Sequence, residues 1–324
     1  MCTAANYKSK DHYFGRTLDW EVSYGEKVTV TPRNFPFKFY KEDSIDSHLA
    51  LIGMAVVAQN TPLYFEATNE KGLSMAGLNF PQNAVYLPFN KDKYNITVSE
   101  IIPWVLSKSE KVEDAKLLLE KTNILNIQLD KNYPLTPLHW IVSDRDSSIT
   151  VEPTAAGLKI YENPVGVLTN NPPFSYHMYN LANYMNLTTE DPENRFSDKA
   201  DLKIYCKGMG SIGLPGDPSS ASRFIRAAFL ALNSVSSEDE SDSVSQFFHI
   251  LDGVAQVRGC ARASEDKYEQ SLYTSCCNTD KGIYYYITCS NPRINAVKMH
   301  SEKLDGSSLL SYELKKENEI AFHN

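Results

Sequence analysis

The sequence has no long apolar run and no excess of basic residues. No stretch reaches the roughly eighteen apolar residues that a membrane span needs, and charges occur throughout the first twenty residues, at Lys8, Lys10, Asp11, Arg16 and Asp19. Neither a transmembrane helix nor an export signal is expected. Because 32 Lys and Arg face 40 Asp and Glu, the cationic surplus that phosphate binding needs is also missing. We expect a cytoplasmic protein that binds no nucleic acid and inserts into no membrane.

Metal-binding patterns are missing as well. The chain has six cysteines and seven histidines, but no CxxC pair and no HExxH motif. Metal sites of the common types use such spacings, so we expect neither a metal nor a cofactor. In a reducing compartment the cysteines should be free thiols. No histidine has a recognisable local partner, so a catalytic histidine base is not predicted.

Strand-like and helix-like segments alternate in blocks. Residues 1–80 contain β-branched and aromatic runs such as HYFGRTL and LALIGMAVVA, which predict one antiparallel sheet. Two helices follow over residues 97–121, where Thr97 and Glu100 have capping-box spacing. LHWIVSD, SITVEP and LKIYEN predict a second antiparallel sheet; helices at 175–185, 220–232 and 244–257 and further strands follow. The block order predicts an α+β fold, a four-layer αββα sandwich of two antiparallel sheets flanked by helices.

The segment between two of these helices, residues 188–219, is rich in Gly, Pro and charge. Irregular loops of this length in a compact domain are usually functional or pack on a neighbouring subunit. Residues 236–243, SSEDESDS, predict a solvated acidic turn. With 42% hydrophobic residues in the chain, we expect residues 2–324 to form a single domain.

The start of the chain, MCTAANYK, places a cysteine behind the initiator methionine. A second residue as small as Cys2 allows removal of Met1, which leaves a thiol and a primary amine on one residue. An α-amine has a pKa of about 7.7 to 8.0 and can accept a proton near neutral pH. Cys2 is therefore a candidate nucleophile with its own base, whereas a chain that retains Met1 lacks that amine.

Two charged residues follow closely in FGRTLDW. Arg16 is a candidate for holding the Cys2 thiolate by its charge, and Asp19 for orienting the α-amine by hydrogen bonding. Taken singly, each is more typical of a surface ion pair. Asn79 and Asn170 lie at the ends of apolar runs, where asparagine commonly forms turns. Turn formation is therefore the alternative to a functional role for both residues.

Six blocks in order resemble the choloylglycine hydrolase family of N-terminal nucleophile hydrolases: MCT, FGRTLDW, NEKGLSMAGLNFP, LTNNPPF, GLPGDPSSASRFIR and YTSC with KGIYYY. The resemblance runs from Cys2 to about Met299 and implies amide hydrolysis through an acyl-enzyme on Cys2. It also implies which residues form the site. Arg16 and Asp19 match the family's arginine and aspartate, Asn79 and Asn170 its oxyanion-hole residues, and Arg223 its distal arginine, with Asn171 as the second choice for Asn170.

Within this family the chain is most similar to bile salt hydrolases. The substrates implied are glycine- and taurine-conjugated bile salts, and the assembly implied is a homotetramer. An apolar pocket must receive the steroid, and the candidates near the N-terminus or the strand ends are Leu18, Trp20, Tyr24, Phe65, Leu135 and Leu138.

Three alternatives remain open. Penicillin V acylases share the nucleophile, but that branch often has a tyrosine where this chain has Asn79. Glutamine amidotransferases also begin with Met-Cys, yet they normally carry a synthase domain for which 324 residues leave no room. A non-catalytic bile-acid-binding protein on the same fold would not require Cys2.

Overall fold

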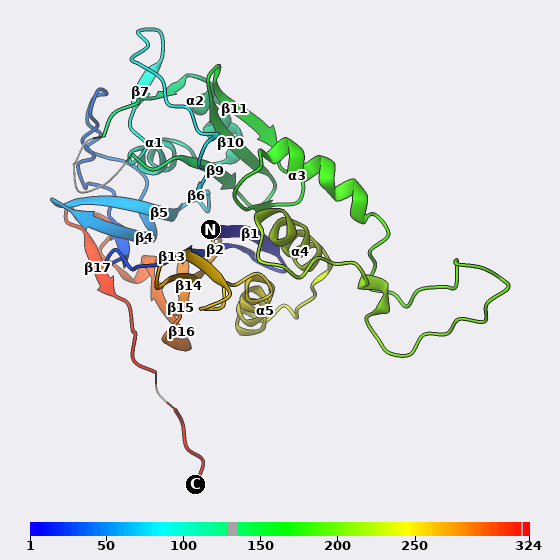
Figure 1. Cartoon of the computed structure of the whole chain (residues 1–324). Coiled ribbons are helices and arrows are strands. Elements are labelled where there is room, and N and C mark those ends of the chain that lie inside the picture. The colour runs from blue at the N-terminus through cyan, green and yellow to red at the C-terminus, as the bar shows by residue number, and fades with distance from the viewer. Residues whose placement is uncertain (129–134, 319) are drawn as a thin grey trace.

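Two antiparallel sheets lie face to face, and helices cover their outer faces (Figure 1). The computed structural model describes residues 1–128, 135–318 and 320–324. Buried side chains of both sheets belong to one apolar cluster, which includes Ala4 and Phe14 from the first sheet and Val30, Ile52 and Leu78 from the second. This architecture is the αββα sandwich that the sequence predicted.

The first sheet has the strand order β12-β1-β2-β14-β15-β16, and β13 pairs with β14. Its strands are β1 (Cys2–Lys8), β2 (His12–Trp20), β12 (Val167–Leu168), β13 (Ala261–Ser264), β14 (Lys267–Asn278), β15 (Ile283–Thr288) and β16 (Asn291–Lys298). The strand that starts with Cys2 therefore lies inside the sheet, with neighbours on both sides.

The second sheet has the order β11-β10-β9-β6-β5-β4-β3-β17. Its strands are β3 (Lys27–Thr31), β4 (Leu51–Ala58), β5 (Thr61–Asn69), β6 (Ser74–Asn79), β9 (Leu138–Ser143), β10 (Ser148–Thr154), β11 (Gly157–Glu162) and β17 (Leu310–Glu313). A parallel pair, β7 (Tyr94–Ile96) and β8 (Thr122–Ile124), lies outside both sheets.

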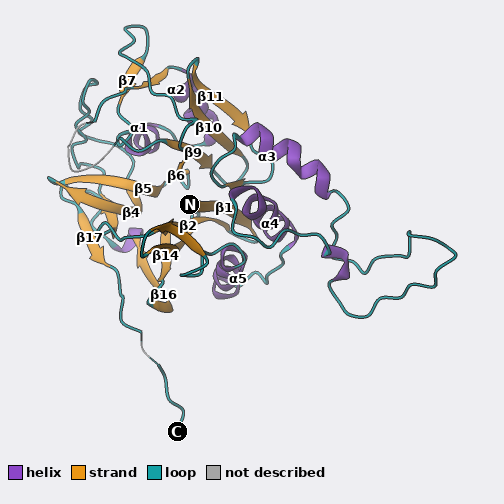
Figure 2. Ribbon diagram, viewed as in Figure 1, coloured by secondary structure: helices purple, strands orange, loops and turns teal. Residues whose placement is uncertain are grey.

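The helices divide between the two outer faces (Figure 2). Helices α1 (Ile101–Lys108) and α2 (Val112–Glu120) cover the second sheet, where Trp104 and Leu106 join Trp140 and Val142 in an apolar cluster. Helices α3 (Phe174–Leu181), α4 (Ser220–Asn233) and α5 (Glu240–Asp252) lie over the first sheet. Short 3-10 turns occur at Ala182–Tyr184, Met209–Ser211 and Met299–Ser301.

The prediction that residues 1–80 form one sheet was wrong. Strands β1 and β2 pair with β12 and β14, whereas β3 to β6 pair onward to β9, β10 and β11 in the other sheet. The strands at 138–162 are therefore part of the sheet that β3 starts. Local alternation of apolar and polar residues predicts a strand, but the partner of that strand depends on tertiary packing. The sequence near Trp20 therefore does not indicate that the chain passes there from the first sheet to the second.

Two helix starts also differ from the predictions. Helix α1 begins at Ile101 rather than near Thr97, although the Glu100 carboxylate accepts the Thr97 backbone N–H at 2.7 Å. Helix α5 begins at Glu240, inside the predicted acidic turn, because acidic residues stabilise the positive end of a helix dipole. Glu240 is not simply solvated either, since it accepts hydrogen bonds from Tyr285 and Lys281.

The irregular segment 188–219 was predicted correctly: its one regular element is the 3-10 turn Met209–Ser211. It forms an arm that extends away from the body beyond α3 and α4 (Figure 1). Its side chains include the largely exposed Phe196 (85%) and Tyr205 (80%). Exposed aromatic side chains on a projecting segment are typical of a contact surface.

Candidate active site

Cys2 starts β1 and is 5% exposed. Its strand pairs with β2, so that Cys2 lies opposite Leu18 and Ala4 lies opposite Arg16. Directly opposite residues in an antiparallel pair point to the same face, so Cys2, Leu18 and Arg16 share a face. The pairing thus brings Arg16 to the face of the sheet that carries Cys2, and both residues line one cavity.

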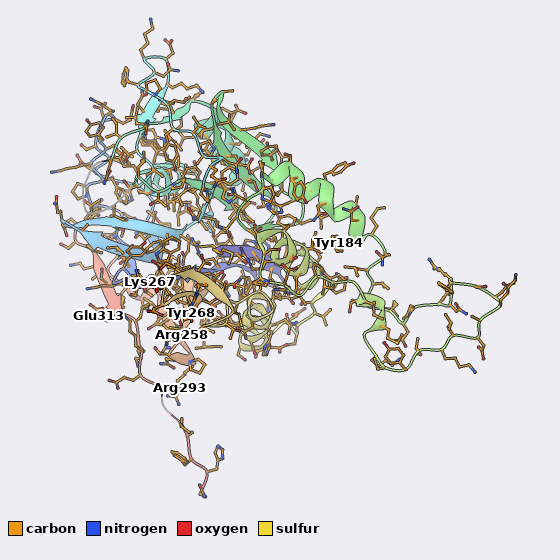
Figure 3. All side chains as sticks on the ribbon, viewed as in Figure 1. Tyr184, Arg258, Lys267, Tyr268, Arg293 and Glu313 are labelled. Atoms are coloured by element: carbon orange, nitrogen blue, oxygen red, sulfur yellow. The ribbon has the colours of Figure 1, made fainter. Side chains whose placement is uncertain are left out.

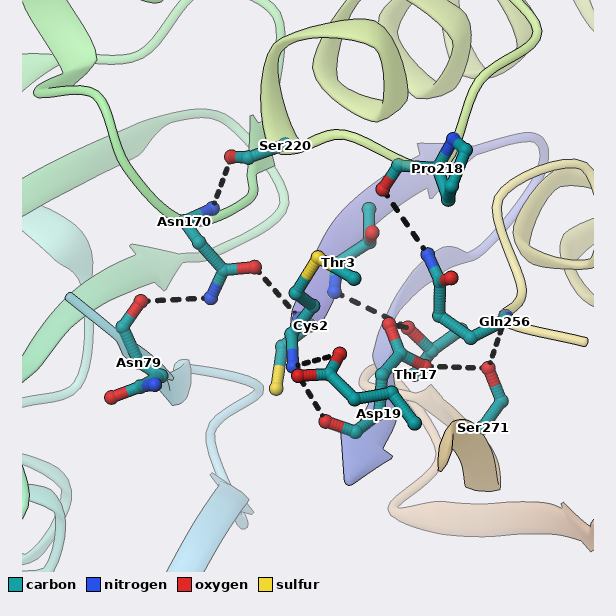
Figure 4. A network of polar contacts seen from close by, with 12 residues as sticks. Cys2, Thr3, Thr17, Asp19, Asn79, Asn170, Pro218, Ser220, Gln256 and Ser271 are labelled. Carbon is teal, nitrogen blue, oxygen red and sulfur yellow. Dashed lines mark hydrogen bonds and ion pairs between the residues drawn. The ribbon is translucent and has the colours of Figure 1, made fainter. Parts of the chain in front are cut away.

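Asn170 holds the backbone nitrogen of Cys2 (Figure 4). The Cys2 nitrogen donates to Asn170 Oδ1 at 2.8 Å, and Arg223 Nη2 donates to the same oxygen at 2.8 Å. Two donors on one side fix this atom as the amide oxygen. In a chain that starts at Cys2, the same contact would orient the α-amine.

The amide nitrogen of Asn170 points the other way, toward Asn79. Asn170 Nδ2 donates to the Asn79 backbone oxygen at 2.8 Å (Figure 4), and Asn79 lies at the cavity beside Cys2. The second N–H of this amide is left for another acceptor. Asn171 instead donates to the Pro81 carbonyl at 2.6 Å. Of the two asparagines, the structure brings Asn170 to Cys2.

Arg223 lies on α4 and is fully buried. Besides Asn170, it donates to the Cys2 carbonyl and to the Thr3 hydroxyl at 2.6 Å. Burial lowers the pKa of its guanidinium, while the negative charge of Asp19 opposes that shift. Arg223 thus ties helix α4 to the first two residues of β1.

Arg16 is buried between the two sheets. Its guanidinium donates to the Phe65 and Gly77 carbonyls, and Nε lies 3.8 Å from the Glu66 carboxylate. Burial alone lowers the pKa of Arg16, but negative groups, with Cys2 first among them, outweigh burial and raise it. A permanently charged guanidinium beside the thiol favours the thiolate.

Glu66 supports Arg16 and was not predicted from the sequence. Its carboxylate accepts hydrogen bonds from the Tyr273 hydroxyl at 2.8 Å and the Tyr284 hydroxyl at 2.5 Å. Burial raises the pKa of this carboxyl, and the charge of Arg16 opposes the shift. The carboxylate comes from β5 and both tyrosines from the first sheet, so this contact also joins the two sheets.

The Asp19 carboxylate is buried and held by two hydroxyls (Figure 4). Thr17 Oγ1 donates to one oxygen at 3.1 Å and Ser271 Oγ to the other at 2.5 Å. Ser271 in turn accepts the Gln256 backbone N–H at 2.8 Å. Burial raises the pKa of Asp19, and Arg223 opposes that shift. Among the described residues, the nitrogen of Cys2 bonds to Asn170 rather than to this carboxylate.

Met1 is present and lies against the same strands. Its terminal nitrogen donates to the Asp19 carbonyl at 2.7 Å and to Glu269 Oε2 at 2.9 Å, and its carbonyl accepts the Asp19 N–H at 3.0 Å. With Met1 attached, the nitrogen of Cys2 is an amide and cannot take up a proton.

Two buried histidines hold the loop that carries Asn170. His139 Nε2 contacts the Thr169 carbonyl at 2.8 Å, and His177 Nε2 contacts the Asn170 carbonyl at 2.9 Å. Both accepting atoms are carbonyl oxygens, so each histidine carries its proton on Nε2. Burial lowers the pKa of His177 to about 4, so this side chain is neutral at neutral pH.

An apolar cavity opens at Cys2. Five of the six predicted substrate-binding residues line it. Among the described residues the lining consists of Cys2, Arg16, Leu18, Asp19, Trp20, Tyr24, Val56, Leu63, Tyr64, Phe65, Gly77, Asn79, Val98, Ser99, Thr136 and Leu138. Leu135, the sixth, is not among these lining residues, whereas its neighbours Thr136 and Leu138 are. Val56, Leu63, Tyr64 and Val98 were missed because their runs predict ordinary core as well.

Residues 1–128, 135–318 and 320–324 contain neither a membrane-spanning helix nor a cluster of metal-binding side chains. No helix there is long and apolar enough to cross a membrane, and no three His, Cys, Asp or Glu side chains lie close enough together to hold a metal ion. All six cysteines are free, as expected.

The facing sheets, with a cysteine at the start of an inner strand, define the fold of an N-terminal nucleophile hydrolase. Residues 2–312 match the family model of the linear amide C–N hydrolases, choloylglycine hydrolase family. The chain belongs to this family.

Named relatives match over almost the whole chain. A bile salt hydrolase/transferase of Lactiplantibacillus plantarum is 51% identical, with 98% of each chain covered. A bile salt hydrolase/transferase of Clostridium perfringens is 41% identical, again with 98% of each covered. The crystal structure of a conjugated bile acid hydrolase mutant from Clostridium perfringens superposes with a TM-score of 0.91, 39% identity and full coverage of both chains.

Proposed function

We propose that the chain hydrolyses the amide bond of glycine- and taurine-conjugated bile salts. The observation that carries this proposal is the apolar cavity that ends at Cys2. Its aromatic and aliphatic lining suits a rigid steroid body, and Cys2, Arg16 and Asn79 line it as well, where the amide would lie. The names of the relatives point to the same substrates.

The proposed mechanism uses the α-amine of Cys2 after removal of Met1. The thiol gives its proton to that amine, the thiolate attacks the amide carbonyl, and the amine passes the proton to the departing nitrogen. Asn170 Oδ1 orients the amine, while the free N–H of its amide and the Asn79 side chain stabilise the oxyanion. Arg16 stabilises the thiolate, and Asp19 fixes the strand end at which Cys2 lies. Water then hydrolyses the thioester. None of these steps calls for a cofactor.

The same acyl-enzyme also permits acyl transfer. By microscopic reversibility, an amine that enters where the first amine left can attack the thioester in place of water. Both relatives reported above are named hydrolase/transferase. We therefore include transfer to amines in the proposed function, as the second fate of one intermediate.

We expect bile salts to be better substrates than penicillin V. Both substrates are anionic and use the same nucleophile, so the acyl pocket must discriminate, and each buried methylene contributes about 1–3 kcal/mol. A steroid offers far more such groups to Trp20, Phe65 and Leu63 than a phenoxymethyl group does. Release of amine from both substrate types, compared as kcat/KM, tests this. A value for penicillin V that equals or exceeds that for every conjugate would contradict the substrate assignment and leave the nucleophile untouched.

The projecting arm is our candidate for assembly into a homotetramer. It projects clear of the body with its side chains uncovered (Figure 3), and exposed apolar side chains are stabilised only if another surface covers them. We expect light scattering to give a tetramer at micromolar concentration and Phe196→Glu with Tyr205→Glu to give smaller species. Leu117→Glu is the matched control, since this exposed residue lies on α2, on the other side of the molecule. A wild-type monomer would contradict the proposal.

A cytoplasmic location remains part of the proposal. Six unpaired cysteines are what a reducing compartment maintains.

The domain organisation of the chain is likewise a proposal: we infer one domain over residues 2–324, since the two sheets share a core.

A further inference from the structure

Glu269 is a largely buried carboxylate with one partner. It lies on β14, its side chain is 17% exposed, and Oε2 is 2.9 Å from the terminal nitrogen of Met1. In the part of the chain that the structure describes, that ammonium group is the only hydrogen-bond or ion-pair partner of this side chain. The Asp19 carbonyl accepts a second hydrogen bond from the same nitrogen at 2.7 Å. A carboxylate and a carbonyl thus hold a primary ammonium group one residue away from the nucleophile.

Removal of Met1 takes this ammonium away. A mostly buried carboxylate that loses its cation is costly unless another cation replaces it. Among the described residues, the nearby positive groups are already engaged. The Cys2 nitrogen, which becomes an amine once Met1 is removed, is held by Asn170 at 2.8 Å. Arg223, whose charge interacts with Glu269, donates to Asn170 Oδ1 and to the Cys2 carbonyl, and Lys267 Nζ pairs with Glu21 at 3.4 Å. The replacement should therefore come from outside the chain.

The proposed reaction supplies such a cation in each turnover, because cleavage of the amide releases a primary amine beside Cys2. We propose that Glu269 and the Asp19 carbonyl form a binding subsite for the ammonium group of that amine, and that the subsite also receives other primary amines before they attack the acyl-enzyme. The inference rests on the proposed function and adds the residue that recognises the amine. In this view the Met1 ammonium marks where the ligand binds.

Acyl transfer to the amine conserves all atoms and charge. The bound ammonium loses one proton to solvent, and the free amine attacks the thioester carbonyl. The C–S bond breaks as the C–N bond forms, and the second proton of the nitrogen passes through the Cys2 amine to the thiolate. An acyl thioester and an ammonium ion become an amide, a thiol and one released proton. Glu269 takes part by binding the amine and is not the nucleophile or the base.

The test uses the full chain starting at Cys2 and two probes of equal size. Glycinamide carries a primary ammonium group, and glycolamide has a hydroxyl in its place. Each is added at pH 7 while taurine release from a taurine-conjugated bile salt is measured. We expect glycinamide to inhibit about tenfold more strongly than glycolamide, in line with one charge-assisted contact. In Glu269→Gln this difference should disappear, and the ratio of N-acyl glycinamide to free bile acid should fall about tenfold.

Glu21→Gln is the matched control, because Glu21 is similarly exposed at 22% and pairs with Lys267 rather than with Met1. It should keep the wild-type preference and product ratio. Equal inhibition by the two probes in the wild type would overturn the proposal, even if Glu269→Gln did not fold. A shifted pH profile of hydrolysis in Glu269→Gln with an unchanged preference for glycinamide would also overturn it, since Glu269 would then serve the Cys2 amine. Absence of hydrolysis in the wild type would instead refute the proposed function.

Discussion

Replacement of Cys2 by alanine is expected to abolish turnover and leave the fold intact. The reacting sulfur is lost, whereas the packing changes little, because Ala4 and Ala5 already form the next part of the same strand. Loss of the nucleophile removes the whole covalent route, so the activity should fall by at least about a thousandfold. The measurement is amine release by the purified variant, with circular dichroism and thermal unfolding as checks on the fold.

Cys276→Ala is a suitable control for that variant. Cys276 is also a buried thiol, and burial raises its pKa well above the ordinary value, so it should remain an unreactive thiol. The Cys276→Ala variant should retain turnover, and a small electrophile should still label its Cys2. More than a few per cent of wild-type activity in Cys2→Ala would refute the assignment of the nucleophile, and the non-catalytic binding protein would become the better interpretation.

An N-terminal extension on Cys2 is expected to block the enzyme until it is cut off. We would attach a short peptide with a protease site directly before Cys2, so that cleavage leaves Cys2 as the first residue. Before cleavage the nitrogen of Cys2 is an amide without basicity, as it is when Met1 is attached. Because a positioned acid–base group contributes about 10²- to 10⁴-fold, cleavage should raise kcat by at least about a hundredfold.

The same polypeptide serves as its own control in that experiment. A second extended chain with an uncleavable site should stay inactive after protease treatment. Full activity before cleavage would show that the α-amine is not the base, although Cys2 could still be the nucleophile. The two predictions therefore separate the two functions that the sequence assigns to one residue.

The candidate site was predictable where short motifs carry it. FGRTLDW contains both Arg16 and Asp19, and the structure places both at the cavity with Cys2. Asn170 and Arg223, which the resemblance placed in the site, meet at the nitrogen and carbonyl of Cys2. The contact between Asn170 Oδ1 and the nitrogen of Cys2 was not predicted, since the sequence proposed Asp19 for that position, and Asp19 is instead held by hydroxyls.

The supporting residues were not predictable. Glu66, Ser271 and Glu269 lie in ordinary strand runs, and each acts on a residue that is distant in the sequence. Their proximity depends on which strands pair and in what register, and local periodicity carries neither fact. The wrong division of the strands between the two sheets has the same origin.

The central position of β1 and β2 limits when the amino terminus can become buried. Thr17 of β2 pairs with Thr274 of β14, so the first hairpin cannot complete its sheet until almost all of the chain has been synthesised. At about 5–20 residues per second, translation of the intervening chain takes roughly ten seconds to a minute. During that time Met1 is accessible to an aminopeptidase, whereas in the folded chain its nitrogen is bonded to Asp19 and Glu269. Late pairing with the C-terminal strands therefore provides a window for exposing the α-amine of Cys2 before the active site closes around it.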